Sequence, residues 1–361
     1  MSIINNHNNN MKTLISVIPA TGLLLITLAC LALLTQAKAV VPPPDGGYPN
    51  FTTAEGDNAL RSLTIGAGNT AIGTFSLFEV STGNFNTAVG ALALDLNQAD
   101  SNTAIGAAAL LFNITGTQNT AVGTAALEFN DIGDQNTATG AFALFSNTSG
   151  AINTATGMQA LFSNTSGTDN TATGFQALLN NTTGGDNTAT GGETLVNNTI
   201  GSSNTANGSG ALTFNTSGNG NSAFGYDALE MNDTGNFNTA VGLSALFNNN
   251  ADDNTAVGES ALLNNTVGSD NTAIGGQALH HNVGGAANTA TGFHALFSNT
   301  TGTGNTAIGD GALNSTDGDG NTALGAGAGA AAVNSNNVYI GAGMNGVAGE
   351  KQRLLHRKHF W

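Results

Sequence analysis

The sequence predicts an all-β fold, a parallel β-solenoid in which each coil of the chain stacks on the one before it. Three observations predict it. The motif Asn-Thr-Ala-x-Gly recurs in 16 copies that begin at residues from Asn69 to Asn321, with Ser222 in place of Thr in one of them. The step between copies is 17 residues in twelve cases and 16 in three, and a fixed step of this size is typical of stacked repeats that share one continuous core. Finally, Thr and Gly in every copy disfavour helix, and 17 residues are too few for the common two-helix repeats.

The full unit reads N-T-A-x-G-x-x-A-L-x-x-N-x-x-G-x-x, with the first Asn numbered as position 1. Position 3 is Ala and position 5 is Gly in all 16 copies, and position 9 is Leu in 15. Asn and Gly at positions 1, 5, 12 and 15 mark turns. We therefore expect two short strands per coil, at positions 2–4 and about 7–10, stacked in parallel register over roughly 17–18 coils.

Strand alternation places positions 2 and 4 on one face and positions 1, 3 and 5 on the other. Position 4 is apolar in ten copies, so that face is predicted to line the interior with the position-9 Leu: Ile72, Val89, Ile105, Val122, Phe224, Val241, Val257, Ile274, Ile308 and Leu324. The Ala and Gly face has two interpretations, a close contact between three packed rods or a requirement of a tight turn. Asn at positions 1 and 12 is expected to form stacked amide ladders.

The segments outside the repeats predict a secreted or cell-surface protein. An apolar stretch from Leu14 to Leu34 precedes a small-residue cleavage site ending at Ala39, which is typical of a signal peptide. An uncleaved anchor helix and a lipoprotein signal at Cys30 are the alternatives. After cleavage no membrane span is expected in the mature chain. The predicted order is a disordered extension (1–10), signal peptide (11–39), Pro-rich linker (40–51), solenoid (52–350) and basic non-repeat tail (351–361), which is either a native terminus or a frameshifted end.

Both ends of the array are expected to carry degenerate coils. Residues 52–68 keep Thr53-Ala54 and Ala59-Leu60 in register with the repeat, and Asn337 starts one more coil. Atypical end coils are expected as caps, because an open solenoid end exposes strand edges.

Charge excludes two classes of partner. From Val40 to Glu350 the chain has 23 acidic residues and one basic residue, Arg61, which gives a net charge of −22. Nucleic acid and anionic membrane surfaces attract basic patches, so neither is expected to bind. The only cysteine, Cys30, lies in the predicted leader, so no disulfide is expected in the mature chain.

The repeat resembles a known family. Asn69 to Gly73 and Asn102 to Gly106 are similar to the head repeats of trimeric autotransporter adhesins. That resemblance implies a left-handed parallel β-roll, a homotrimer, display on a bacterial surface, and binding of extracellular-matrix proteins or surface glycans. The repeat is longer than that of the family, and the sequence carries neither the family's coiled-coil stalk nor its membrane barrel. Arrays of this period also resemble fibre-like proteins that end in a self-cleaving trimerisation chaperone.

No catalytic residue, cofactor site or metal site is predicted, and the chain is expected not to be an enzyme. His280, His281 and His294 occupy positions 10, 11 and 7 of adjacent coils, where solvated repeat variants are favoured over a metal site or a general base. Position-17 carboxylates are interpreted as solvated turn residues, with calcium binding as the alternative: Asp169, Asp186 and Asp270. Sequons such as those at Asn147 and Asn164 follow from the repeat itself.

The predicted function is therefore an adhesin-like or structural role, with two alternatives. Four consecutive coils read Thr-Ala-Thr, which resembles the ice-binding face of some solenoid antifreeze proteins; their position-4 residues are Thr139, Thr156, Thr173 and Thr190. Because position 4 is apolar in most copies, these side chains are expected to point inward. The other alternative is a carbohydrate-acting β-helix, which would need a cluster of carboxylates where this sequence scatters its acids.

Overall fold

The computed structural model describes residues 49–332, 334–344 and 354–356. These residues form one parallel sheet of single short strands, one per coil, and the only helix among them is the 3-10 turn η1 (Pro49–Phe51). The predicted extension and signal peptide, and most of the linker and the tail, lie outside the described residues. None of the described helices is long and apolar enough to cross a membrane.

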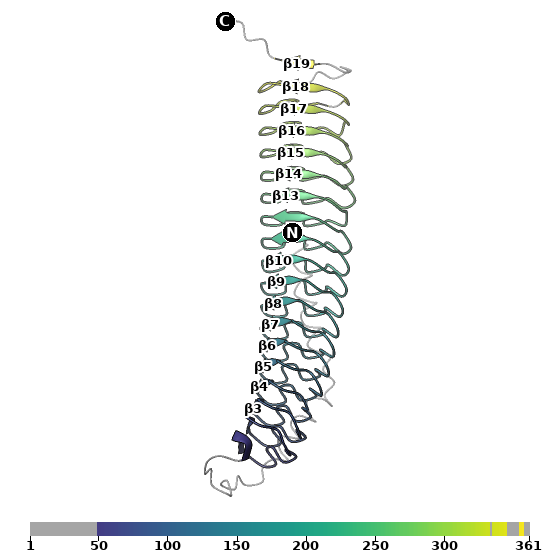
Figure 1. Ribbon diagram of the computed structural model, residues 1–361. Helices are drawn as coiled ribbons and strands as arrows, with labels where there is room; N and C mark the ends of the chain where they lie inside the picture. The colour runs from purple at the N-terminus through teal and green to yellow at the C-terminus, as the bar shows by residue number, and fades with distance from the viewer. Residues whose placement is uncertain (1–48, 333, 345–353, 357–361) are drawn as a thin grey trace, which may run out of the picture. The chain divides into compact units, whose positions relative to one another are not determined.

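Nineteen strands of three residues each stack in chain order (Figure 1). Each pairs in parallel with the next, and equal positions of the repeat lie opposite one another, as Ala155 lies opposite Ala172. The strands are β1 (Thr53–Glu55), β2 (Thr70–Ile72), β3 (Thr87–Val89), β4 (Thr103–Ile105), β5 (Thr120–Val122), β6 (Thr137–Thr139), β7 (Thr154–Thr156), β8 (Thr171–Thr173), β9 (Thr188–Thr190), β10 (Thr205–Asn207), β11 (Ser222–Phe224), β12 (Thr239–Val241), β13 (Thr255–Val257), β14 (Thr272–Ile274), β15 (Thr289–Thr291), β16 (Thr306–Ile308), β17 (Thr322–Leu324), β18 (Val338–Ile340) and β19 (Leu354–His356).

The stack includes the degenerate coils expected at both ends. Strand β1 pairs with β2, and β18 pairs with β17 in the same register as the regular copies. The sheet also continues beyond the expected boundary, because β19 lies within the stretch predicted as a non-repeat tail and pairs with β18.

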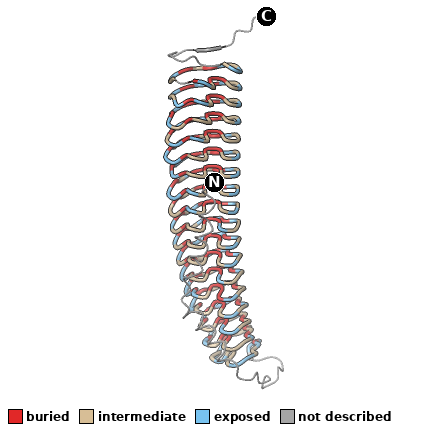
Figure 2. Tube along the Cα trace, turned by 180° about the vertical axis from the view of Figure 1, so that it is seen from behind, coloured by how far each residue is buried: buried red, intermediate tan, exposed pale blue. Residues whose placement is uncertain are grey.

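The prediction of which strand face lines the interior was wrong. Position-3 Ala is fully buried, as at Ala71 and Ala155, whereas position 4 points outward, with Ile72 42% and Val257 36% exposed. Figure 2 shows the buried strip recurring in coil after coil. The physical reason is volume. Each coil encloses one large side chain, the position-9 Leu, together with the position-8 Ala and two Asn side chains. The strand can therefore add only a methyl group to this close-packed space.

The expected second strand, at about positions 7–10, is a turn instead. Positions 7 and 9 both have positive φ, 61° at Leu92 and 52° at Leu94, which extended strands do not contain. The turn nevertheless hydrogen-bonds from coil to coil: Leu92 N donates to Thr74 O at 2.9 Å, and Leu94 N donates to Ala109 O at 3.0 Å. The backbone groups at these positions are thus satisfied without a second sheet.

The amide ladders are confirmed. At position 12, Asn147 Nδ2 donates to Asn130 Oδ1 at 2.6 Å, and Asn164 Nδ2 donates to Asn147 Oδ1 at 2.8 Å. At position 1, Asn153 Nδ2 donates to Asn136 Oδ1 at 3.1 Å. The two columns meet at the position-15 carbonyl, because Asn153 Nδ2 and Asn164 Nδ2 both donate to Gly167 O, at 2.8 and 3.1 Å. All these side chains are fully buried, and their amide groups are paired with one another and with the position-15 carbonyl, as buried polar groups require.

The invariant Gly at position 5 is explained by the neighbouring coil of the same chain. Gly140 has φ of 134°, and a Cβ added there would lie 2.5 Å from Gly157 O. Position-3 Ala is buried inside the coil and position-5 Gly meets the next coil of the same chain. Packing within one chain therefore explains both small residues, which favours the tight-turn interpretation of this face over a contact between three rods.

Candidate functional site

The outward positions 2 and 4 of strands β2–β18 form one continuous surface, which we name the outer sheet face. No charged side chain occurs on it, although residues 40–350 carry a net charge of −22. Val89 and Val122 are half-buried on this face. Nine further apolar side chains on it are 36–49% exposed: Ile72, Ile105, Phe224, Val241, Val257, Ile274, Ile308, Leu324 and Ile340. Exposed apolar groups gathered on one face mark interaction surfaces more often than scattered ones do.

Within the outer sheet face, strands β6–β9 carry threonine at both outward positions. We name this set the Thr segment: Thr137, Thr139, Thr154, Thr156, Thr171, Thr173, Thr188 and Thr190. All eight are exposed, so the prediction that the position-4 members point inward was wrong. Their hydroxyls make no side-chain hydrogen bond within the described structure. By contrast, the position-13 hydroxyls of Thr148 and Thr165 donate to carbonyls of the next coil, at 2.9 Å each.

The three histidines of the array come together around one phenylalanine. Ring centroids of His280 and His281 lie 4.4 Å apart, and the Phe297 ring lies 5.2, 4.8 and 4.6 Å from those of His280, His281 and His294. Burial lowers the pKa of His280, and the charges of the other two histidines lower it further. Over the described ranges, no group of three or more His, Cys, Asp or Glu side chains is placed to hold a metal ion.

The position-17 carboxylates and the sequons have structural explanations. Asp169, Asp186 and Asp270 are exposed and have φ of 58–59°, a left-handed conformation that Asp tolerates better than most residues. The sequon residues Asn147 and Asn164 are fully buried in the position-12 ladder. Their side-chain nitrogens are therefore not accessible to glycosylation in the folded chain.

The position-10 side chains form a further column, which was not predicted from the sequence. It is apolar in ten of the 16 copies, and Phe145 stacks on Phe162 with centroids 5.0 Å apart. Acids replace the apolar residue in some coils. Burial raises the pKa of Asp95 and Glu128, and burial together with the charge of Asp227 raises the pKa of Glu230 to about 7. The repeated apolar residues at position 10 were the signal that could have revealed this half-buried column.

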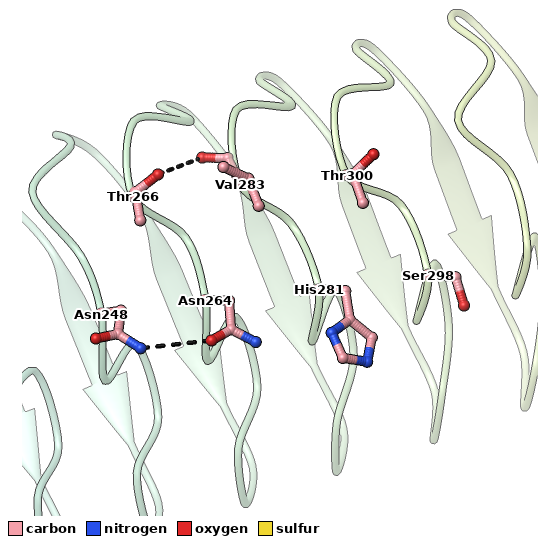
Figure 3. Close-up of a pocket in the computed structure, with 7 residues that line it drawn as sticks. All are labelled: Asn248, Asn264, Thr266, His281, Val283, Ser298 and Thr300. Atoms are coloured by element: carbon pink, nitrogen blue, oxygen red, sulfur yellow. Dashed lines mark hydrogen bonds between the residues drawn. The ribbon is translucent and has the colours of Figure 1, made fainter.

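A shallow groove of about 510 Å³ runs along the side of four coils (Figure 3). Two rows of side chains flank it, one from position 11 and one from position 13. The position-12 Asn between them is fully buried. The position-11 row is Asn248, Asn264, His281 and Ser298, and the position-13 row is Thr266, Val283 and Thr300. We name this the side groove. Neither row repeats by residue type, which is why the sequence did not predict it.

Comparison of the chain with protein-family models and with curated proteins gave no match.

Proposed function

We propose that this chain is a secreted or cell-surface fibrous protein with an adhesin-like role, acting as a homotrimer. The observation that carries the proposal is the outer sheet face, an uncharged row of half-exposed apolar side chains on a strongly acidic chain. Repetition gives such a fibre many equivalent contacts, so its binding would rest on multivalency. A homotrimer multiplies those contacts further.

Two further copies of the chain are the occupants that fit the outer sheet face. Acidic copies repel one another, and this face is free of charge from β2 to β18. Its apolar stretches on β2–β5 and β11–β14, separated by the Thr segment, match themselves in a parallel, in-register arrangement. Covering the remaining exposed area of nine side chains that are 36–49% exposed would contribute roughly 5–10 kcal/mol per copy before the cost of association.

Light scattering on the purified secreted chain tests the trimer. We expect a mass three times that of the monomer. Val257→Asp should give monomers, because it places like charges together at the centre of the interface while leaving the coil interior unchanged. Val267→Asp is the matched control: Val267 is 72% exposed and lies off the outer sheet face, so the trimer should persist. A wild-type chain that is monomeric at all concentrations would exclude the trimer.

Adhesion is tested by binding of the secreted chain to surfaces coated with extracellular-matrix proteins or with glycans. The trimer should bind at least tenfold more tightly than Val257→Asp, because three copies engage the surface together. Absence of binding to every such surface would argue against an adhesin-like role and leave a structural coat.

The Thr segment supports a second candidate function, ice binding. Eight exposed hydroxyls with adjacent methyl groups lie on a backbone paired strand to strand. Their spacing is about 4.8 Å between coils and about 6.6 Å along each strand. Thr is stiff at χ1, so the array is regular and preorganised, as recognition of a repeating lattice of water molecules requires.

Thermal hysteresis of the purified chain tests this candidate. Thr156→Tyr should abolish the hysteresis by interrupting the array, whereas Thr183→Tyr, at an exposed site off the sheet, should not. Equal hysteresis in wild type and Thr156→Tyr would exclude the Thr segment as an ice-binding surface. The two candidates assign different occupants to one face, so a trimer that covers the Thr segment and strong hysteresis should not occur together.

A further inference from the structure

Several polar atoms of the side groove have no hydrogen-bond partner within the part of the chain that the structure describes. His281 and Ser298 make no side-chain hydrogen bond to any part of the chain that the structure describes, and Asn248 Oδ1 accepts none there. Asn248 Nδ2 donates to Asn264 Oδ1 at 3.4 Å, and Asn264 Nδ2 donates to His280 O at 3.2 Å. The position-11 row therefore has free hydrogen-bonding groups at Asn248, at one end, and at His281 and Ser298, at the other.

Neighbouring rings and the backbone hold the His281 side chain in place. Its ring lies edge-on to Phe297 at 4.8 Å and to His280 at 4.4 Å, and its backbone N donates to Phe297 O at 3.1 Å. Figure 3 shows His281 in the lower row, between Asn264 and Ser298. The exposed Val283 side chain gives the opposite row an apolar surface at the same level. The groove thus combines an ordered aromatic ring, an apolar patch and polar groups.

The backbone along the groove is already paired, which disfavours a peptide strand as the ligand. Ser298 N donates to Asn314 O at 2.8 Å, Thr266 N to Val283 O at 3.2 Å, and Val283 N to Thr300 O at 3.0 Å. Addition of an extended peptide needs an unpaired strand edge, and these coils present none along the groove. Recognition here would have to come from side chains.

The charge of the groove and of the whole chain limits the chemical class of the ligand further. None of the seven lining residues is Asp, Glu, Lys or Arg, and the acidic carboxylate of Asp317 is engaged by Thr300, whose Oγ1 donates to its Oδ1 at 2.8 Å. A chain with a net charge of −22 from residue 40 to residue 350 repels nucleic acids and sulfated or carboxylated glycans. A neutral ligand rich in hydroxyl groups can form hydrogen bonds with the amide, hydroxyl and imidazole groups that line the groove.

We propose that the side groove binds a neutral oligosaccharide lying along the stack of coils. Four coils span about 14 Å at about 4.8 Å per coil, which accommodates three to four linked sugars. Sugar hydroxyls pair with Asn248, His281 and Ser298, while the His281 ring and Val283 contact the apolar face of a sugar. This inference rests on the proposed adhesin-like function and gives it a ligand class and a site.

Nuclear magnetic resonance of the full chain with cellotetraose, chitotetraose and a heparin tetrasaccharide tests the proposal. A neutral tetrasaccharide should shift the imidazole resonances of His281 in a saturable way, and the heparin fragment should not. His281→Ala should weaken binding at least tenfold, and Ser298→Ala should weaken it several-fold. His281 is exposed, so its truncation should leave the coil folded, which the remaining histidine resonances report.

Ser163→Ala is the matched control, because Ser163 occupies position 11 in a distant coil outside the groove. It should leave binding unchanged. Equal loss in Ser163→Ala and Ser298→Ala, or shifts with heparin alone, would overturn the site. If the chain trimerises and adheres while neither neutral tetrasaccharide binds, the groove proposal fails and the adhesin-like function stands. If the groove binds a neutral tetrasaccharide but the chain adheres to no coated surface, the groove proposal stands and the adhesin-like function fails.

Discussion

Replacing one rung of the position-12 ladder should destabilise the solenoid far more than replacing a part-buried asparagine at position 11. The change is Asn164→Ala. It removes the donations from Asn164 Nδ2 to Asn147 Oδ1 at 2.8 Å and to Gly167 O at 3.1 Å, and the donation from Asn181 Nδ2 to Asn164 Oδ1 at 2.8 Å. All three asparagine side chains are fully buried, so water does not replace the lost partners.

The magnitude follows from which groups lose their partners. Gly167 O keeps a donor, Asn153 Nδ2 at 2.8 Å, and Asn181 Nδ2 keeps an acceptor, Gly184 O at 2.9 Å. Asn147 Oδ1 loses its hydrogen-bond donor altogether. Each lost bond costs about 1 kcal/mol and an orphaned buried acceptor costs about 1–3 kcal/mol, so we expect a loss of about 3–5 kcal/mol.

Asn180→Ala is the matched control, because it removes the same kind of side chain at position 11, one residue before Asn181, the next rung of the ladder. Asn180 is part-buried at position 11, and its side chain makes one hydrogen bond, to Asn197 Oδ1 at 3.2 Å. Loss of a single, solvent-accessible bond should cost less than about 1 kcal/mol. The difference in stability between the two variants therefore gives the contribution of the buried ladder, apart from the general effect of deleting an amide.

Amide hydrogen exchange is the appropriate assay, because solenoids unfold as coupled repeats and not always in one step. In Asn164→Ala, protection of the backbone amides of Leu161 and Leu178 should fall at least 100-fold, the equivalent of about 3 kcal/mol. Asn180→Ala should change protection less than tenfold. Similar losses in the two variants would show that the amide ladder does not stabilise the coils as the geometry implies.

Three further predictions test the glycine positions, the end of the ladder and a half-buried carboxyl. Gly140→Ala should destabilise by about 2–5 kcal/mol, because φ is 134° and the new Cβ would meet the next coil; Gly192→Ala, which meets nothing within 4 Å, should change the denaturation midpoint little. Thr316→Asn should stabilise by about 1 kcal/mol in urea unfolding, because Asn299 Oδ1 is buried without a partner at the point where the ladder ends. The Glu230 carboxyl, with its pKa raised from 4.5 to about 7, favours folding when protonated. Stability should therefore fall by about 1–2 kcal/mol, after allowance for solvent screening, as pH rises from 4.5 to 7. Glu230→Gln should remove that dependence, and an unchanged pH profile would contradict the assignment.

The candidate surfaces were predicted only in part. The Thr-Ala-Thr run was predicted from the sequence, because the regular spacing of one residue type is visible there. The prediction that Thr156 points into the coil was wrong. The side groove was not predicted, because its width depends on which side chains, such as His281 and Val283, happen to stand at positions 11 and 13 of adjacent coils. The clustering of three histidines around Phe297 also depends on how the turn folds back across neighbouring coils.

The sequence by itself determined the period, the parallel register and the two amide ladders, because a repeated Asn must meet its own copy when coils stack. Strand alternation also determined correctly that positions 2 and 4 share one face. Only the tertiary structure decided which face is inside, since alternation permits either choice and the side-chain volume available within a coil selects between them. Position 3 is Ala in all 16 copies while position 4 varies among Ile, Val, Thr, Asn, Phe and Leu. That contrast follows from a core that admits one methyl group from each strand and an outer face with no such limit.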